Sequence, residues 1–298
     1  MSEHALPSWV EASEFPFQPR HVEVAPGEGL SVTDVGTGPV VVFSHGTPTW
    51  SYEWRHLVKG LSGTHRCLAV DHLGFGLSAR PAGADYRPEA HAARFSRLVD
   101  ALGLTRYHLV VHDFGGPFAL HEALERPERV ASLTVINSFC WAFGDSARTK
   151  VMASLAGTSL FRFLYGSVNL SFRIAASAWG QAQPATNETW APYLGFFPDA
   201  DSRRRVLWPL AKSMAGSAAF TESLWERRER LARTPMQLLW GLADSAFPPS
   251  ALERWKRGFP HAAVHAHPDA GHWPHEEVPA FCLERVRALV GSARSPAT

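Results

Sequence analysis

The chain has 298 residues, of which 45% are apolar and 19% are charged, and its 29 basic side chains nearly balance 28 acidic ones. This composition excludes intrinsic disorder, collagen and coiled coil. The arginine-rich runs at residues 203–205 and 227–233 are interleaved with or flanked by acids, which is typical of solvated helix faces. We therefore expect no nucleic-acid partner.

Cysteine usage and the N-terminal segment predict the compartment. Cys67, Cys140 and Cys282 are far apart in the chain, so they indicate neither a disulfide framework nor a zinc ribbon, and they fit a reducing cytosol. Residues 1–19 lack a basic segment followed by an apolar run, and no stretch of about eighteen apolar residues occurs. We expect a soluble cytoplasmic protein without a membrane segment.

Eight short apolar segments predict strands. The first two form an antiparallel hairpin turned at Pro26, Gly27 and Gly29. The later segments read as strands buried on both faces, and amphipathic stretches separate most of them, as a parallel sheet requires. The expected strands are residues 21–24, 30–35, 40–43, 67–70, 108–111, 132–136, 236–240 and 263–266. The fold class is therefore α/β, with a mostly parallel eight-stranded sheet.

The alternation breaks between strands six and seven. Residues 139–232 are rich in Trp, Phe, Leu and Ala, and they show helical periodicity with glycine and proline as punctuation. A structureless loop of this length is improbable in a compact domain. We expect a helical cap at 139–232, inserted into a core made of residues 1–138 and 233–298.

The first candidate site is a sharp turn from strand to helix around Asp113. The segment from Val110 to Pro117 follows a strand and opens a helix, as in a nucleophile elbow, where small flanking residues let one side chain stand above the sheet. An ordinary helix N-cap would also explain Asp113. Gly115 and Gly116 favour the elbow, because glycine is poor helix material unless the backbone must approach another chain segment closely.

Three further loops at the ends of strands contain candidate catalytic groups. The loop around Thr47 could supply a backbone N–H to an oxyanion, as could the N–H of Phe114. Asp244 and His272 follow the last two strands, and the order elbow, acid, histidine is that of a hydrolase triad. A metal site built from His265, His267 and His272 is the weaker interpretation, because strand alternation places the first two at a solvent-facing edge.

The motifs resemble those of haloalkane dehalogenases, in the aspartate-nucleophile branch of the α/β hydrolases. The similarity extends over nearly all of the chain after about residue 20. It is carried by the segments His45–Arg55 (HGTPTWSYEWR), Asp71–Ser78 (DHLGFGLS), His112–Gly116 (HDFGG) and Tyr193–Asp199 (YLGFFPD). The resemblance implies an α/β-hydrolase fold with its pocket between the sheet and the cap.

The mechanism implied by the resemblance suits these residue types. An aspartate is ionised at neutral pH and can displace a halide, giving an alkyl ester at Asp113. His272, oriented by Asp244, would then activate water, while the N–H groups of Thr47 and Phe114 hold the oxyanion. The expected partners are a small apolar substrate and water, and the chemistry requires no cofactor or metal.

Two positions depart from the family pattern, which usually holds the halide with a Trp after the nucleophile and an Asn or Trp in the His-Gly loop. Here those positions hold Phe114 and Thr47. We therefore keep epoxide hydrolysis, lactone or ester opening, and non-catalytic ligand binding as alternatives. An epoxide hydrolase needs cap phenols facing the nucleophile. The pocket candidates are Trp50, Trp141, Trp179, Tyr165 and Tyr193.

Overall fold

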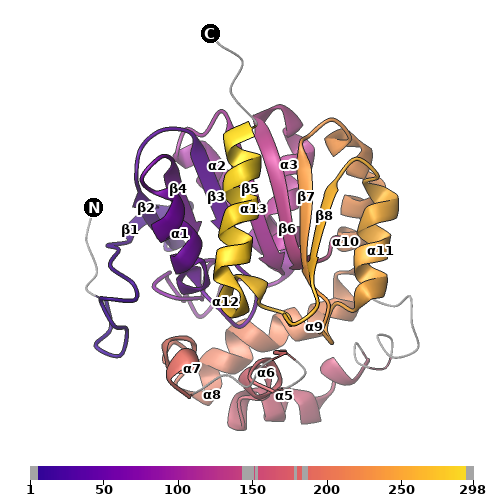
Figure 1. The fold of residues 1–298 in the computed structure, drawn as a ribbon. Helices are drawn as coiled ribbons and strands as arrows, with labels where there is room; N and C mark the ends of the chain where they lie inside the picture. The colour runs from indigo at the N-terminus through magenta and orange to yellow at the C-terminus, as the bar shows by residue number, and fades with distance from the viewer. Residues whose placement is uncertain (1–5, 143–150, 152–153, 178–179, 183–186, 293–298) are drawn as a thin grey trace.

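The computed structural model describes residues 6–142, 151, 154–177, 180–182 and 187–292. An eight-stranded sheet with the order β1-β2-β4-β3-β5-β6-β7-β8 forms its centre (Figure 1). Each strand end lies within two residues of its predicted position. The strands are β1 (Arg20–Glu23), β2 (Gly29–Val35), β3 (Val40–Ser44), β4 (Arg66–Val70), β5 (Tyr107–Asp113), β6 (Val130–Ser138), β7 (Met236–Gly241) and β8 (Ala263–His267).

The sheet is parallel except at one strand. β2 pairs antiparallel with both β1 and β4, whereas β4, β3, β5, β6, β7 and β8 pair in parallel. This confirms the predicted hairpin and the mostly parallel sheet. Because the strands β3 to β8 point the same way, the loops that follow them gather at one edge of the sheet.

The central strands are apolar because helices cover both of their faces. Every residue of β5, β6 and β7 is buried. The prediction that all later strands are buried on both faces is wrong for β8, in which Ala263, Val264 and Ala266 are exposed. β8 is an edge strand of the sheet, so a neighbouring strand flanks it on one side only.

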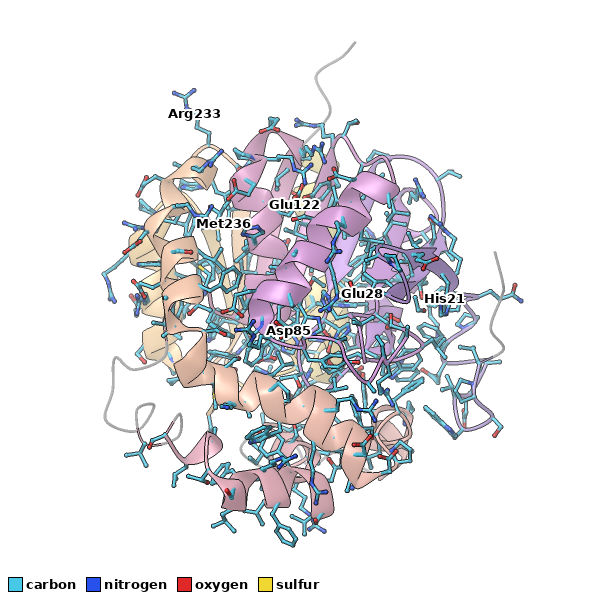
Figure 2. The ribbon with its side chains drawn as sticks, turned by 180° about the vertical axis from the view of Figure 1, so that it is seen from behind. His21, Glu28, Asp85, Glu122, Arg233 and Met236 are labelled. Carbon is cyan, nitrogen blue, oxygen red and sulfur yellow. The ribbon has the colours of Figure 1, made fainter. Side chains whose placement is uncertain are left out.

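Helices form a layer on each face of the sheet. In Figure 1, α1 and α13 lie in front of the strands, α2 and α3 lie behind them, and α11 lies beside the edge strand β8. Figure 2 shows the rear face, where Glu122 lies on α3 and Glu28 lies near α2, whose Arg94 it binds at 2.5 Å. The bounds are α1 (Arg55–Leu61), α2 (Pro88–Ala101), α3 (Gly115–Glu125), α11 (Pro249–Gly258), α12 (Pro274–Glu277) and α13 (Pro279–Ser292), with short turns η1 (Ser51–Trp54) and η2 (Pro127–Arg129).

All described elements between β6 and β7 are helical. In Figure 1, α5 to α9 lie together beyond one end of the sheet. The Trp50 indole N–H, in the loop after β3, donates to the Pro192 carbonyl of α7 at 3.0 Å, so this is the end where the parallel strands finish. The elements are α5 (Ser159–Ser167), α6 (Leu170–Ala175), α7 (Asn187–Leu194), α8 (Ala200–Ser202), η3 (Arg203–Leu207), α9 (Trp208–Gly216), α10 (Ala218–Glu226) and η4 (Arg228–Leu231).

Two features bear on the environment of the chain. Among the described residues, no helix is long and apolar enough to cross a membrane. Cys67, Cys140 and Cys282 are free thiols in the protein interior. Burial raises the pKa of all three thiols, which keeps them in the neutral form.

Candidate active site

Asp113 lies at a strained turn between β5 and α3. Its φ is 48°, in the left-handed region that non-glycine residues rarely adopt. A Cβ on Gly115 would lie 2.1 Å from the Ser44 carbonyl oxygen, and one on Gly116 would lie 2.1 Å from Ser138 Oγ. The expected close backbone approach is therefore confirmed. The N-cap interpretation is wrong, because the N-cap of α3 is Phe114 and no side chain caps the helix.

The loop after β3 supplies a hydrogen-bond donor to the Asp113 carboxylate. The Thr47 backbone N–H donates to Asp113 Oδ1 at 2.8 Å. A Cβ on Gly46 would lie 2.3 Å from Asp113 Cβ, so only glycine lets this loop come so close. Thr47 thus lies where an oxyanion donor is required. The second expected donor, the Phe114 N–H, stays a prediction.

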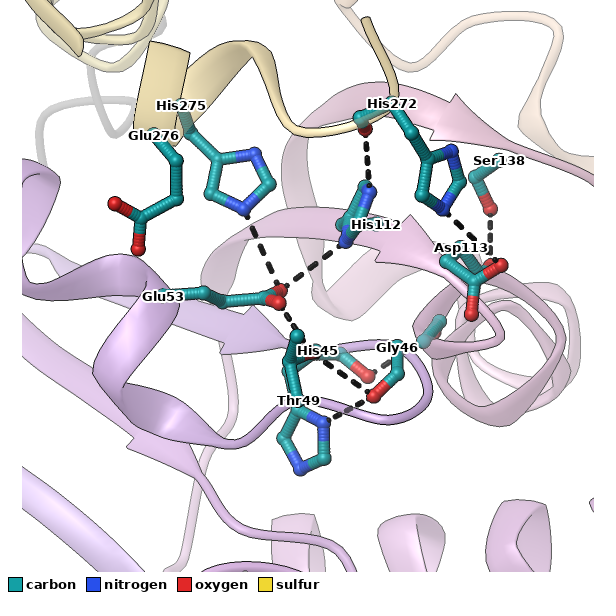
Figure 3. A network of polar contacts seen from close by, with 12 residues as sticks. His45, Gly46, Thr49, Glu53, His112, Asp113, Ser138, His272, His275 and Glu276 are labelled. Carbon is teal, nitrogen blue, oxygen red and sulfur yellow. Dashed lines mark hydrogen bonds and ion pairs between the residues drawn. The ribbon is translucent and has the colours of Figure 1, made fainter. Parts of the chain in front are cut away.

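Asp244 and His272 come together beside Asp113. His272 Nδ1 lies 2.8 Å from Asp244 Oδ2. His272 Nε2 lies 3.6 Å from Asp113 Oδ2, and Figure 3 shows this side of the imidazole facing Asp113. The backbone N–H groups of Ala246 and Phe247 donate to Asp244 Oδ1 at 2.6 and 3.0 Å. The structure therefore brings together the three residues that the sequence places at the ends of β5, β7 and β8.

Asp113, Asp244 and His272 are buried, and their charges change the pKa values of His272 and Asp244. Burial disfavours the charged imidazole of His272, but the carboxylates of Asp244 and Asp113 outweigh this effect and raise its pKa to about 10. Burial likewise disfavours the Asp244 carboxylate, yet the charge and hydrogen bond of His272 lower its pKa. Both shifts mark a carboxylate–imidazolium pair of the kind found at catalytic sites.

Asn137, at the end of β6, is a site residue that the sequence analysis passed over. Its Nδ2 donates to Asp244 Oδ2 at 2.7 Å, and its Oδ1 accepts from the Gly241 N–H at 2.8 Å. Its φ of 31° is strained for a non-glycine residue. In the sequence, only its position at the end of a strand indicated that it could belong to the site.

The tryptophans considered as pocket donors have other roles or lie outside the described residues. The Trp50 N–H is committed to the Pro192 carbonyl. Trp141 packs edge-on against Trp225 and Trp255 in an aromatic cluster. Trp179 lies outside the described residues. Of these candidates, Trp50 therefore has no free N–H that could replace the expected donor at Phe114.

The two cap tyrosines differ in their surroundings. The Tyr193 hydroxyl donates to Glu276, which also binds Arg55, so it does not serve as an acid toward Asp113. Burial and the charge of Asp113 raise the pKa of the Tyr165 hydroxyl. The pair of phenols expected for an epoxide hydrolase is therefore incomplete.

The histidines fall into separate groups. His272 belongs to the triad, whereas His265 and His267 lie on the half-exposed edge strand β8. Among the described residues, the side chains that could hold a metal ion are Glu53, His112 and His275, whose ligand atoms lie within 4.8 Å of one another. The sequence analysis did not single out this buried group, although Glu53 and His112 fall within its motifs.

Comparisons with known proteins identify the family to which the chain belongs. Residues 39–279 match the family model described as alpha/beta hydrolase fold. The chain is 31% identical over 277 residues to haloalkane dehalogenase 2 of Mycobacterium tuberculosis, covering 93% of this chain and 94% of that protein. It is 29% identical over 296 residues to the cis-3-alkyl-4-alkyloxetan-2-one decarboxylase of Shewanella oneidensis, covering 95% and 91%.

Solved structures are similar across the whole fold. The haloalkane dehalogenase DatA from Agrobacterium tumefaciens C58 superposes with a TM-score of 0.80 at 25% identity, covering 93% of this chain and 97% of that one. A reconstructed ancestral haloalkane dehalogenase superposes with a TM-score of 0.79 at 26% identity, covering 92% and 99%.

Proposed function

The chain belongs to the α/β-hydrolase fold family, and from this premise we propose that it is a hydrolase in which Asp113 forms a covalent ester with the substrate. The observation that carries the proposal is the pair of contacts on one carboxylate. Asp113 Oδ1 accepts the Thr47 N–H, while Oδ2 faces His272. One oxygen is thus held, and the other is available as a nucleophile.

In the first half-reaction, Asp113 Oδ2 attacks an sp³ carbon of the substrate. The new bond is the ester C–O bond, and the leaving group departs with the electron pair of the bond that breaks. Such a displacement needs no base, because the carboxylate is already an anion. The Thr47 N–H keeps the carboxylate in one orientation, so the attacking oxygen needs little reorganisation.

The second half-reaction uses His272. Once Asp113 is an ester, it no longer carries the charge that contributes to the raised pKa of His272, so the imidazole can become a neutral base. His272 Nε2 then takes a proton from water, whose oxygen attacks the ester carbonyl. The resulting oxyanion lies at the Thr47 N–H. As it collapses, His272 returns its proton to the departing oxygen and the alcohol leaves. The Asp113 carboxyl group then loses its proton to the solvent, which restores the carboxylate.

The first substrate class that we propose is haloalkanes with bromide or iodide as the leaving group. Haloalkane and water then give an alcohol, a halide ion and a proton. Phe114 offers no N–H beside the nucleophile. Thr47, however, carries a buried hydroxyl without a hydrogen-bond partner, on the residue whose N–H reaches Asp113. This O–H is available to a leaving group.

A second candidate class is strained lactones, and the phenyl ring of Phe114 favours it. Attack of Asp113 on the ring carbon bonded to oxygen breaks that C–O bond and releases a carboxylate that stays attached to the substrate. Its charge spreads over two oxygens, so no halide donor is required. Water then yields a hydroxy acid, whereas loss of carbon dioxide yields an alkene. The similarity to the oxetan-2-one decarboxylase of Shewanella oneidensis reported above supports this class.

The proposal is tested by trapping the ester. We expect His272→Gln to accumulate a covalent adduct on Asp113 when it is incubated with 1-bromobutane, a β-lactone or an epoxide, one of which should react. Intact mass gives the size of the adduct and hence the substrate class. His265→Gln, on the edge strand, is the matched control and should turn over without an adduct.

Isotope labelling provides the second measurement. A single wild-type turnover in heavy-oxygen water should place the label in the Asp113 carboxylate, because water attacks the ester carbonyl. Label found only in the product, together with an unmodified His272→Gln protein on all three substrates, would rule out covalent catalysis by Asp113.

A further inference from the structure

A buried group of three side chains lies beside the triad and has no part in the mechanism above. Glu53 of η1, His112 of β5 and His275 of α12 are fully buried, and Figure 3 shows the carboxylate between the two imidazoles. Glu53 Oε1 lies 3.3 Å from His112 Nδ1 and 3.7 Å from His275 Nε2. One carboxylate oxygen and two imidazole nitrogens thus converge on one point in the protein interior.

His275 is the member of this group whose polar atoms are not hydrogen-bonded. Neither of its ring nitrogens has a hydrogen-bond partner within the described part of the chain. The contact of 3.7 Å between Nε2 and Glu53 Oε1 is too long for a hydrogen bond. Because an unpaired polar group in the interior costs free energy, such an imidazole requires a partner of another kind.

The contacts of His112 direct a lone pair toward the same point. His112 Nε2 lies 2.8 Å from the main-chain carbonyl oxygen of His272, which can only accept, so Nε2 carries a proton. The lone pair of a neutral His112 is then on Nδ1, which faces Glu53 Oε1. Histidines that bind metals usually donate their other ring N–H to a carbonyl or carboxylate in this way.

The spacing of the three atoms suits a tetrahedral ion. Zinc binds imidazole nitrogen and carboxylate oxygen at about 2.0–2.2 Å, so neighbouring ligands of tetrahedral zinc lie roughly 3.3–3.5 Å apart. The distances of 3.3 and 3.7 Å from Glu53 Oε1 lie on either side of this range. An octahedral ion such as Mg²⁺ needs neighbouring ligands roughly 3 Å apart and prefers oxygen. The donor atoms and their spacing therefore favour zinc.

The surroundings of the group hold its ligands and leave the carboxylate without a basic partner. The Thr49 hydroxyl donates to Glu53 Oε2, which leaves Oε1 free to face the imidazoles. Trp54 stacks on His275 with ring centroids 4.6 Å apart. Among the residues that the structure describes, no lysine or arginine forms an ion pair with Glu53. A divalent cation would supply the countercharge that a buried carboxylate needs.

We propose that Glu53, His112 and His275 bind one zinc ion, which has a structural role. The ligand atoms are Glu53 Oε1, His112 Nδ1 and His275 Nε2. The ion joins η1, β5 and α12. His112 directly precedes Asp113 and binds the carbonyl of His272, so the ion fixes the two segments that carry these residues. The proposal does not depend on the proposed function, in which zinc takes no part.

The direct test measures zinc binding by the purified full chain without a histidine tag. The protein is stripped with a chelator, freed of the chelator and titrated with zinc sulfate in a calorimeter. We expect one zinc ion per chain, with a dissociation constant below about 1 µM. The midpoint of thermal unfolding should rise when zinc is added, because the ion binds the folded chain.

Substitutions then locate the ion. His275→Gln and Glu53→Gln each remove one ligand and should weaken zinc binding by more than about 100-fold. Thr49→Val removes only the hydroxyl that holds Glu53, so we expect a loss of about 10- to 100-fold. His265→Gln, on the edge strand β8, is the matched control and should bind zinc as the wild type does.

Cobalt(II) reports the geometry of the site. A tetrahedral cobalt ion absorbs visible light far more strongly than an octahedral one. We expect the stripped wild type to show the strong absorption when cobalt chloride is added, and His275→Gln to lack it. Neither measurement needs a substrate, so a failure of the proposed reaction leaves both results intact.

Three outcomes would overturn the proposal. A stripped wild type that does not bind zinc in the stated range would leave the group as hydrogen-bonded side chains only. Folded His275→Gln and Glu53→Gln proteins that bind zinc as tightly as the wild type would place the ion elsewhere. If these two variants do not fold, an undiminished affinity in Thr49→Val together with a weak cobalt spectrum of the wild type would contradict the proposed ligands.

Discussion

At the scale of single residues, Phe114 and Thr47 are the two positions beside Asp113 that bear on the leaving-group chemistry we propose. Phe114 is buried and packs edge-on against Phe139, with ring centroids 5.1 Å apart. Thr47 contributes a main-chain N–H to Asp113 and a hydroxyl without a partner. Together these two positions offer one side-chain hydrogen-bond donor, the Thr47 hydroxyl.

We predict that Phe114→Trp combined with Thr47→Asn raises halide release from bromoalkanes by roughly 10- to 150-fold, because a hydrogen bond to a charged group contributes about 1.5–3 kcal/mol. Initial rates of bromide and chloride release provide the measurement. Phe114→Met has no N–H and serves as the control. Equal rates in the double variant and wild type would mean that another group already binds the leaving group.

His272 links stability to pH. Its pKa is about 10 in the folded chain and about 6.5 in an unfolded one, so between these values the folded state binds the extra proton. This contribution to stability is complete below pH 6.5 and is lost as the pH rises through about 10. We predict that the free energy of unfolding falls toward alkaline pH, by on the order of 1 kcal/mol per unit.

Urea denaturation at pH 6.5, 8 and 9.5 measures this slope. His272→Gln cannot titrate, so its free energy of unfolding should fall less steeply than that of the wild type over the same interval. Parallel slopes for the two proteins would show that His272 is not protonated in the folded free enzyme.

At the scale of elements, the β5–α3 connection depends on glycine. Gly115 lies so close to the main chain of Ser44 that no side chain fits without moving backbone. This contact between α3 and β3 holds Asp113 in its left-handed conformation. The elbow is therefore made by two elements that are far apart in the sequence, although its glycines are visible in the sequence.

We predict that Gly115→Ala lowers the free energy of unfolding by more than about 2 kcal/mol, because backbone atoms must shift. Gly63→Ala is the control: the position is exposed and open, so the change should stay within about 1 kcal/mol. Chemical denaturation of both variants measures the difference. Similar stabilities would contradict the close approach at the elbow.

At the scale of the whole molecule, polar contacts join the helices between β6 and β7 to the rest of the fold. One is the Trp50 N–H to the Pro192 carbonyl, and another is the Tyr193 hydroxyl to Glu276. Both attach α7 to segments at the carboxyl edge of the sheet. The position of α7 therefore depends on two side-chain hydrogen bonds together with aromatic packing.

We predict that Tyr193→Phe loosens α7 without unfolding the core. Glu276 keeps Arg55 as its partner, so the loss should be about 1–2 kcal/mol. Hydrogen exchange of residues 187–194 should become faster, while that of β5 and β6 stays unchanged. Tyr165→Phe, whose hydroxyl does not bind Glu276, is the control. Equal acceleration in both variants would show that the Tyr193 hydroxyl does not anchor α7.

The sequence alone determined the sheet, the elbow and the three candidate catalytic positions. Apolar runs of strand length and glycines beside Asp113 are local signals, because strand pairing and sharp turns depend on neighbouring residues. Asp244 and His272 were found by their order along the chain, since loops after parallel strands meet at one edge. These features can be predicted from the sequence without any interatomic distances.

Only the tertiary structure decided which polar groups are already bonded. It showed that Asn137 donates a hydrogen bond to Asp244 and that the Trp50 N–H and the Tyr193 hydroxyl already donate to other groups. It also showed that part of β8 is exposed. It also brought Glu53, His112 and His275 together in the interior. Such pairings join segments distant in sequence, and a hydrogen bond forms or fails over a few tenths of an ångström, which no local pattern encodes.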